Sequence, residues 1–252
     1  MTSSPRPAAV QRTRTQIVVY AVAQAYCRLL WIVACRFRLR GRSRIPRQGG
    51  ALICANHQSM FDPVVVGLCC DRRLNYLARK SLFNHRGFAR LIRFLDAIPI
   101  EREGLGLAGI KETIRRLKQG ELVLMFPEGT RTADGDLQPL KPGLLAIARR
   151  CRVPLIPVGL DGAFDAWPRQ ARWPRLATMA VVIGRPIDAQ TIAASSDDDI
   201  LQLLHERMAD ALRGARSMRR RIGRGGQATR RSSGGVTIWS MGRASTSEPS
   251  AA

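Results

Sequence analysis

Short, fully apolar runs alternate with amphipathic stretches from Gly41 onward. Four of these runs read as buried strands, at residues 50–56 (GALICAN), 121–126 (ELVLMF), 153–160 (VPLIPVGL) and 177–184 (ATMAVVIG). Strands that are apolar along their whole length are typical of a sheet covered on both faces. Together with the helical patterns between them, they predict an α/β fold with a mostly parallel sheet flanked by helices.

The helical patterns have recognisable ends. One carries an apolar stripe from Leu107 to Leu117, and Gly120 follows just past its end. A glycine in that position is typical of a helix C-terminus. A second pattern covers residues 142–150, and a third covers residues 195–214, where acidic side chains at the start suit a helix N-terminus.

Residues 17–37 form an apolar stretch that is long enough to cross a bilayer. Arg28 lies near its middle, where a charge costs about 2.5–3.5 kcal/mol on insertion scales. Gln24 adds to that cost. We therefore expect a membrane-associated helix lying in the interface rather than a clean span. The alternative is the buried first helix of a soluble domain.

These patterns divide the chain into three parts. Residues 1–40 would be a basic arm and the membrane-associated helix, and residues 41–213 the folded α/β domain. Residues 214–252 are rich in Gly, Ser and Arg, a composition that predicts a disordered basic tail.

Charge and cysteine content limit the classes of partner and of metal or disulfide site that the chain could have. The chain has 41 basic and 19 acidic residues, a net charge of +22, which indicates an anionic partner such as nucleic acid, a bilayer surface or a phosphorylated substrate. No nucleic-acid-binding module is recognisable, and aromatic residues make up only 6% of the chain. The six cysteines contain no CxxC pair, so small buried thiols are favoured over a disulfide or metal framework.

Histidine and aspartate occur twice at the spacing HxxxxD. His205 and Asp210 lie within an unbroken helical pattern, where residues five apart diverge by about 140°. His57 instead follows a predicted buried strand, with Asp62 after it in a turn-like segment that can bend the carboxylate back toward the imidazole. Strand ends are also where open α/β sheets place ligands. His57 is therefore the candidate base, and Asp62 its orienting partner.

The chain offers this base no obvious protein nucleophile. A GxSxG elbow is absent, and Ser59 lies too close to His57 in sequence. We expect His57 to deprotonate a hydroxyl of the substrate itself. The third histidine, His85, is interpreted as a surface or packing residue.

A second strand end carries groups suited to a phosphate. Gly129 lets backbone amides approach a ligand, Thr130 offers a hydroxyl, and Arg131 offers a guanidinium. Arg102 follows another apolar run, and Lys80 lies in a basic segment further upstream. Taken singly, each of these side chains could be an ordinary surface charge or turn residue; together they favour an anionic substrate.

Four segments in this order resemble the glycerolipid acyltransferases of the 1-acylglycerol-3-phosphate acyltransferase type: residues 56–62 (NHQSMFD), 98–102 (IPIER), 126–131 (FPEGTR) and 153–158 (VPLIPV). The resemblance implies the glycerolipid acyltransferase fold. It also implies transfer of a fatty acyl group from acyl-CoA or acyl carrier protein to the free hydroxyl of 1-acylglycerol 3-phosphate, giving phosphatidic acid.

The resemblance also implies roles for individual residues. His57 would be the general base and Asp62 its partner. The acceptor's glycerol phosphate would be bound by Arg102, Glu128, Gly129, Thr130 and Arg131, with Lys80 as a further candidate. Apart from the thioester co-substrate, no cofactor and no metal is expected. We expect a membrane-associated protein on the cytoplasmic face of the inner membrane, with acyl carrier protein as one possible partner.

Two alternatives stay open. The acceptor could be another lysolipid, such as a lyso-ornithine lipid or a different lysophospholipid, for which Arg102 and Arg131 would matter less. The chain could also be a noncatalytic membrane scaffold that has kept the fold, although the presence of both His57 and Asp62 argues against this.

Overall fold

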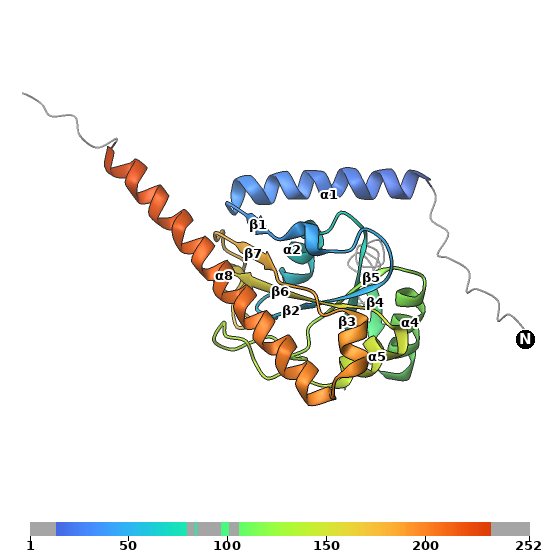
Figure 1. Cartoon of the computed structure of the whole chain (residues 1–252). Helices are drawn as coiled ribbons and strands as arrows, with labels where there is room; N and C mark the ends of the chain where they lie inside the picture. Colours follow the sequence, from blue (N-terminus) through green and yellow to red (C-terminus); the bar gives the residue numbers. More distant parts are fainter. Residues whose placement is uncertain (1–13, 80–83, 85–96, 101–105, 233–252) are drawn as a thin grey trace, which may run out of the picture.

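A computed structural model describes residues 14–79, 84, 97–100 and 106–232 (Figure 1). Its sheet contains these strands: β1 (Arg38–Arg40), β2 (Ala51–Ala55), β3 (Leu74–Arg79), β4 (Ala97–Ile100), β5 (Leu122–Met125), β6 (Leu155–Asp161) and β7 (Ala180–Ile183). The helices are α1 (Arg14–Ala34), the 3-10 helix η1 (Arg42–Arg44), α2 (Asp62–Cys69), α4 (Gly106–Lys118), α5 (Gly143–Cys151), α6 (Ala163–Ala166), α7 (Ala189–Ala194) and α8 (Asp197–Ser232).

The sheet has the order β1-β7-β6-β2-β5-β3-β4. Strands β6, β2, β5, β3 and β4 are parallel to one another, whereas β7 pairs with β6 in the antiparallel sense and β1 is parallel to β7. The predicted α/β fold with a mostly parallel sheet is confirmed, as are the four predicted strands. Strands β1 and β3 were not predicted, because polar or basic side chains interrupt their apolar runs.

Helices cover both faces of the sheet, as the fully apolar strands predict. Alternate residues of β2 point to opposite sides, so that Ile53 belongs to one core cluster and Leu52 to the other. The first cluster is closed by α2 and the second by α5, α7 and the first half of α8. This two-sided burial fixes β2 and β5 in the centre of the sheet.

Helix α8 packs across β6 and continues beyond the predicted end of the domain. A Cβ atom at Gly159 of β6 would lie only 2.1 Å from the backbone nitrogen of Leu212, so the close crossing requires glycine there. The predicted disordered tail from residue 214 is wrong at its start, because the helix runs on to Ser232. Ala215 is fully buried, and Arg219 pairs with Asp161 on β6. Residues 233–252 lie outside the described residues.

Helix α1 lies along one side of the domain (Figure 1). It has two chemically distinct faces. Toward the domain, Gln24 donates to the carbonyl oxygens of Gly67 and Cys70, and Arg28 donates to those of Leu68 and Cys70, at 2.9–3.2 Å. The two polar residues that argued against a clean span thus bind the carbonyl groups at the end of α2, where the helix dipole favours positive charge.

The opposite face of α1 is apolar and open to solvent. Its exposed residues follow helical spacing: Val18, Val22, Tyr26, Leu29 and Val33. Among the described residues, the structure contains no helix whose length and apolarity suffice for a bilayer crossing.

Candidate active site

Two loops meet at the carboxyl edge of the parallel strands. Strands β2 and β5 are direct neighbours, with Cys54 opposite Met125 at their ends. The chain beyond β2 carries His57 and Asp62, and the chain beyond β5 carries Glu128 and the residues that follow it. The sheet therefore brings together two motifs that are about seventy residues apart.

His57 and Asp62 are hydrogen-bonded as the sequence predicts. The imidazole Nδ1 lies 2.8 Å from Oδ2 of Asp62. The same oxygen accepts the backbone N–H groups of Gln58 at 2.5 Å and Ser59 at 2.7 Å. Three donors converging on a fully buried oxygen favour the carboxylate form. With Nδ1 as donor to this carboxylate, the imidazole keeps its lone pair on Nε2.

The imidazole is held by a stacked ring on its face as well as by the hydrogen bond at Nδ1. The ring of Phe126, the residue after β5, stacks on it with a centroid distance of 3.9 Å and an interplanar angle of 15°. The His57 side chain is 20% exposed. Among the described residues, none hydrogen-bonds Nε2.

Glu128 holds the backbone of His57. Its Oε1 accepts the backbone N–H of His57 at 2.7 Å, and its Oε2 accepts the backbone N–H of Gln138 at 3.0 Å. The backbone N–H of Thr132 donates to the carbonyl oxygen of His57 at 2.8 Å. Both polar groups of the His57 peptide are thus bound by the loop after β5. Glu128 is predicted to bind the acceptor; in the structure the residue is only 3% exposed and each carboxylate oxygen accepts a backbone N–H.

Other polar residues of the first motif also fix the loop. Asn56 makes two hydrogen bonds with the backbone of Leu160, through Nδ2 at 2.9 Å and Oδ1 at 2.7 Å, which extends the pairing of β2 with β6. The Ser59 hydroxyl donates to the carbonyl oxygen of Trp167 at 2.9 Å. Ser59 is fully buried, and its hydroxyl holds the loop to the backbone that follows α6.

The remaining residues predicted to bind substrate fall into two groups. Thr130 and Gly129 are exposed at the turn after Glu128, and Arg131 beside them is half-buried. The Lys141 ammonium lies over this turn, 2.8 Å from where a Cβ of Gly129 would be. In the sequence, Lys141 is a weak signal. Nothing in the segment PLKPG, residues 139–143, indicates that the lysine side chain folds back over the turn at Gly129. Arg102, Lys80 and His85 lie outside the described residues.

His205 and Asp210 behave as the helical geometry predicts. Both are exposed on α8, and Asp210 forms an ion pair with Arg213 instead. The same spacing thus forms a hydrogen-bonded pair after β2 and none on α8. The backbone between the two residues, rather than the motif, decides the outcome.

Burial shifts the pKa of both carboxyl groups of the site. Removal from water raises the pKa of Asp62, and the hydrogen bonds from His57, Ser59 and Gln58 oppose this shift. Burial also raises the pKa of Glu128 to about 7, against the opposing effect of its two backbone donors. Glu128 can therefore change protonation near neutral pH, and protonation would remove one acceptor from the contact with His57 and Gln138.

Acidic, histidine and cysteine side chains form no group of three suited to hold a metal ion within the described parts of the chain. Cys35, Cys54, Cys69 and Cys70 are buried thiols and Cys151 is half-buried, so the predicted buried free thiols are confirmed for these residues. Burial raises the pKa of Cys54 and Cys70 to about 12. These thiols are therefore protonated and unreactive at neutral pH.

Comparison with known proteins places this site in a family. A family model described as Acyltransferase matches residues 36–161, half of the chain. The chain belongs to the acyltransferase family. The matched residues contain β2, β5, and both loops of the candidate site.

Individual relatives agree with this assignment. A Bacillus subtilis protein named 1-acyl-sn-glycerol-3-phosphate acyltransferase is 29% identical over 151 residues, which cover 60% of this chain and 73% of that protein. A Streptococcus pneumoniae protein of the same name is 29% identical over 175 residues, 68% of this chain but only 63% of that protein. The crystal structure of the 1-acyl-sn-glycerophosphate acyltransferase PlsC from Thermotoga maritima superposes with a TM-score of 0.69 at 24% identity. That superposition covers 83% of this chain and 84% of that one, and shows a shared fold.

Proposed function

We propose that this acyltransferase is a 1-acylglycerol-3-phosphate O-acyltransferase that uses His57 as its general base. The observation that carries the proposal is the pair of His57 and Asp62 at the carboxyl edge of the sheet, in which Nδ1 is bound to Asp62 and no described residue hydrogen-bonds Nε2. The names of the relatives from Bacillus subtilis and Streptococcus pneumoniae support the choice of reaction.

In the proposed reaction, Nε2 of His57 takes the proton of the acceptor's free hydroxyl as that oxygen adds to the thioester carbonyl. The tetrahedral intermediate then collapses, the carbon–sulfur bond breaks, and the thiolate takes the proton from the imidazolium. Phosphatidic acid and the free thiol of CoA or of acyl carrier protein leave. General-base catalysis of this kind contributes about 10²–10⁴-fold.

Asp62 and Glu128 would act through His57. Asp62 would fix the tautomer and stabilise the imidazolium while the proton resides there. Glu128 would hold the backbone of His57, because both of its oxygens are engaged by backbone N–H groups. This proposal replaces acceptor binding by Glu128 with a positioning role.

The acceptor's phosphate would bind beside the turn after Glu128. Thr130 offers a hydroxyl there, Arg131 a guanidinium and Lys141 an ammonium above Gly129. Cationic forks and ammonium groups are the usual partners of phosphate. Arg102 and Lys80 stay predicted members of the same site.

A lipid acceptor resides in the bilayer, so the enzyme would act at the membrane surface. The exposed apolar stripe of α1 supports an interfacial helix, with Gln24 and Arg28 holding it to the domain. A net charge of +22 favours an anionic leaflet. The cytoplasmic face of the inner membrane stays our prediction.

The test is acyl transfer by the detergent-extracted full chain. Lysophosphatidate would be offered with long-chain acyl-CoA and, separately, with acyl carrier protein thioester, and a lyso-ornithine lipid and lysophosphatidylcholine would serve as competing acceptors. The proposal predicts phosphatidic acid with at least one donor and a preference for lysophosphatidate. Preference for another lysolipid would change the assigned acceptor but keep the reaction type. No transfer in any combination would contradict the enzyme assignment.

A further inference from the structure

The loop between α6 and β7, residues 167–178, exposes two large apolar side chains. Trp173 is 72% exposed and Leu176 is 78% exposed, as open as the outward face of α1. Neither belongs to a core cluster in the described part of the chain. Apolar side chains that stay in water add no burial free energy to folding. The exposure of both Trp173 and Leu176 therefore indicates a surface that a partner covers.

Three arginines alternate with these apolar residues in the segment WPRQARWPRL, residues 167–176. Arg169, Arg172 and Arg175 are all exposed. Within the described residues, none of the three side chains has an ion pair or a hydrogen bond, whereas Arg219 on α8 pairs with Asp161. The loop therefore combines unpaired positive charge with apolar bulk, which fits an anionic partner that has an apolar interior.

The base of the loop is fixed to the candidate active site. The Ser59 hydroxyl donates to the carbonyl oxygen of Trp167, and the Trp167 indole donates to the carbonyl oxygen of Ala171 at 3.1 Å. The backbone N–H of Arg175 donates to the carbonyl oxygen of Ala166 at 2.7 Å. These contacts hold the loop in one place relative to the His57 loop.

The loop is also continuous with α1. The ring of Phe61 contacts Trp31 of α1 at 5.2 Å and Trp167 at 5.1 Å between centroids. At the other end of the loop, the backbone N–H of Met179 donates to the carbonyl oxygen of Cys35, directly after α1. Both ends of the loop thus lie beside the C-terminal end of α1.

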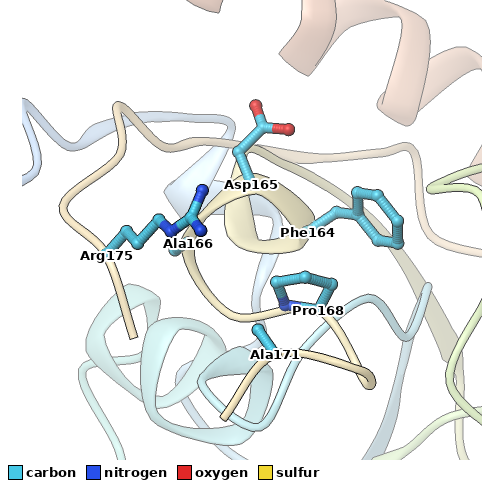
Figure 2. Close-up of a pocket in the computed structure, with 6 residues that line it drawn as sticks. All are labelled: Phe164, Asp165, Ala166, Pro168, Ala171 and Arg175. Atoms are coloured by element: carbon cyan, nitrogen blue, oxygen red, sulfur yellow. The ribbon is translucent and has the colours of Figure 1, made fainter. Parts of the chain in front are cut away.

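A hollow of about 350 Å³ lies between α6 and this loop. Figure 2 shows Phe164 and Pro168 on one side of it and the Arg175 guanidinium on the other. The Asp165 carboxylate also lines the hollow, but it is paired with Arg219 of α8. An apolar wall facing the Arg175 guanidinium suits a group with a phosphate and a glycerol backbone, such as a phospholipid headgroup.

We propose that residues 167–178 form a second bilayer contact beside α1, which binds anionic phospholipids. Trp173 and Leu176 lie at the boundary between headgroups and acyl chains, where tryptophan is favoured. Arg169, Arg172 and Arg175 bind lipid phosphates. Together with α1, the loop sets the height of His57 above the bilayer from which a lipid acceptor would come.

The proposal is tested by vesicle flotation with the full chain and no acyl donor, so an inactive enzyme would not affect the result. Vesicles of phosphatidylcholine alone are compared with vesicles that also contain phosphatidylglycerol. The loop variant carries Arg169→Gln, Arg172→Gln and Arg175→Gln. Its matched control carries Arg150→Gln, Arg152→Gln and Arg185→Gln, which lie at the opposite edge of the sheet, before β6 and after β7.

We expect the loop variant to bind anionic vesicles about a hundredfold more weakly than the wild type, since each arginine near an anionic surface contributes about fivefold. The control variant should lose less than about fivefold, because charges far from the bilayer are screened. A Trp173→Ser, Leu176→Ser variant should weaken binding to both kinds of vesicle. Circular dichroism must show all variants folded, as expected for exposed positions.

A second readout reports the depth of Trp173. Nitroxide-labelled lipids should quench part of the tryptophan fluorescence of the wild type, and Trp173→Phe should remove that part while the protein still binds. Equal binding by the loop variant and its control, or equal quenching with and without Trp173, would overturn the proposal. If the arginine variant kept vesicle binding but lost binding to acidic acyl carrier protein, the loop would be a protein-docking site instead.

Discussion

The Glu128 carboxylate accepts the backbone N–H of His57 at 2.7 Å and so joins the two motif loops of the site. The two residues are 71 positions apart, and both follow central strands of the sheet. A displacement of 1 Å at a reacting group can cost about 10²-fold in rate. The contact therefore links the geometry of the candidate base to the loop after β5.

Replacing Glu128 with glutamine tests whether this residue positions the base. Glutamine offers one oxygen and one amide N–H₂, so one of the two backbone N–H groups would face a donor. We expect kcat to fall by about 10²-fold while KM for lysophosphatidate changes little. A large rise in KM with kcat preserved would instead show that Glu128 binds the acceptor.

Asp62→Asn tests the orienting partner of the base. Asparagine cannot serve three donors as the carboxylate does, and loss of the correct tautomer in comparable dyads costs up to about 10⁴-fold in kcat. The chain contains a matched control, Asp210→Asn, at the same spacing from a histidine but exposed on α8. Steady-state rates should fall for the first variant and stay at the wild-type level for the second. Equal rates for Asp62→Asn and wild type would remove Asp62 from the mechanism.

The buried carboxyl of Glu128 should make stability depend on pH in a specific direction. Its pKa in the fold is about 7, above the ordinary value of 4.5, so the folded chain binds this proton more tightly than the unfolded chain. The contribution to the free energy of unfolding is present below about pH 4.5 and is lost as the pH rises through about 7, on the order of 1–3 kcal/mol.

Urea denaturation of the wild type and of Glu128→Gln at pH 5 and pH 8 measures this contribution. The wild type should lose more stability between the two pH values than the variant does, since glutamine does not titrate. Glu206→Gln, an exposed position on α8, controls for the loss of a carboxylate. An identical pH dependence of wild type and Glu128→Gln would show that Glu128 does not titrate in this range.

Arg28→Leu separates the two roles that α1 could have. The change makes the helix more apolar but removes two hydrogen bonds to the end of α2, each worth about 1 kcal/mol. We expect trypsin to cleave at Arg36 and Arg38 several-fold faster in detergent, because α1 docks less firmly. Tyr26→Gln, on the exposed face, should leave the cleavage rate unchanged. A slower cleavage of Arg28→Leu would mean that Arg28 does not hold α1 to the domain.

The sequence was sufficient to predict strands whose side chains are buried on both faces. Strands β2, β5, β6 and β7 are apolar on both faces, so their positions follow from the pattern alone. It was also sufficient for His57 and Asp62, because a strand end allows the bend that a helix forbids.

Other features depend on contacts between distant segments, which no local pattern contains. The carboxylate of Glu128 binds the backbone of His57, a partner that carries no side-chain signal. The end of α8 was misplaced because two of its arginines, which lie in the segment predicted to be a disordered tail, pair with Asp161 on β6 and Asp165 on α6. In the same way, the role of Gln24 and Arg28 is visible only in the structure, where both donate hydrogen bonds to carbonyl oxygens at the end of α2.

The most direct test of the central proposal is the rate of acyl transfer to lysophosphatidate by His57→Ala, with His205→Ala as the matched control. The full chain would be assayed in detergent with the donor that gives the highest wild-type rate. We predict a loss of at least about 10²-fold for His57→Ala and an unchanged rate for His205→Ala. Wild-type transfer by folded His57→Ala would contradict the proposal that His57 is the base.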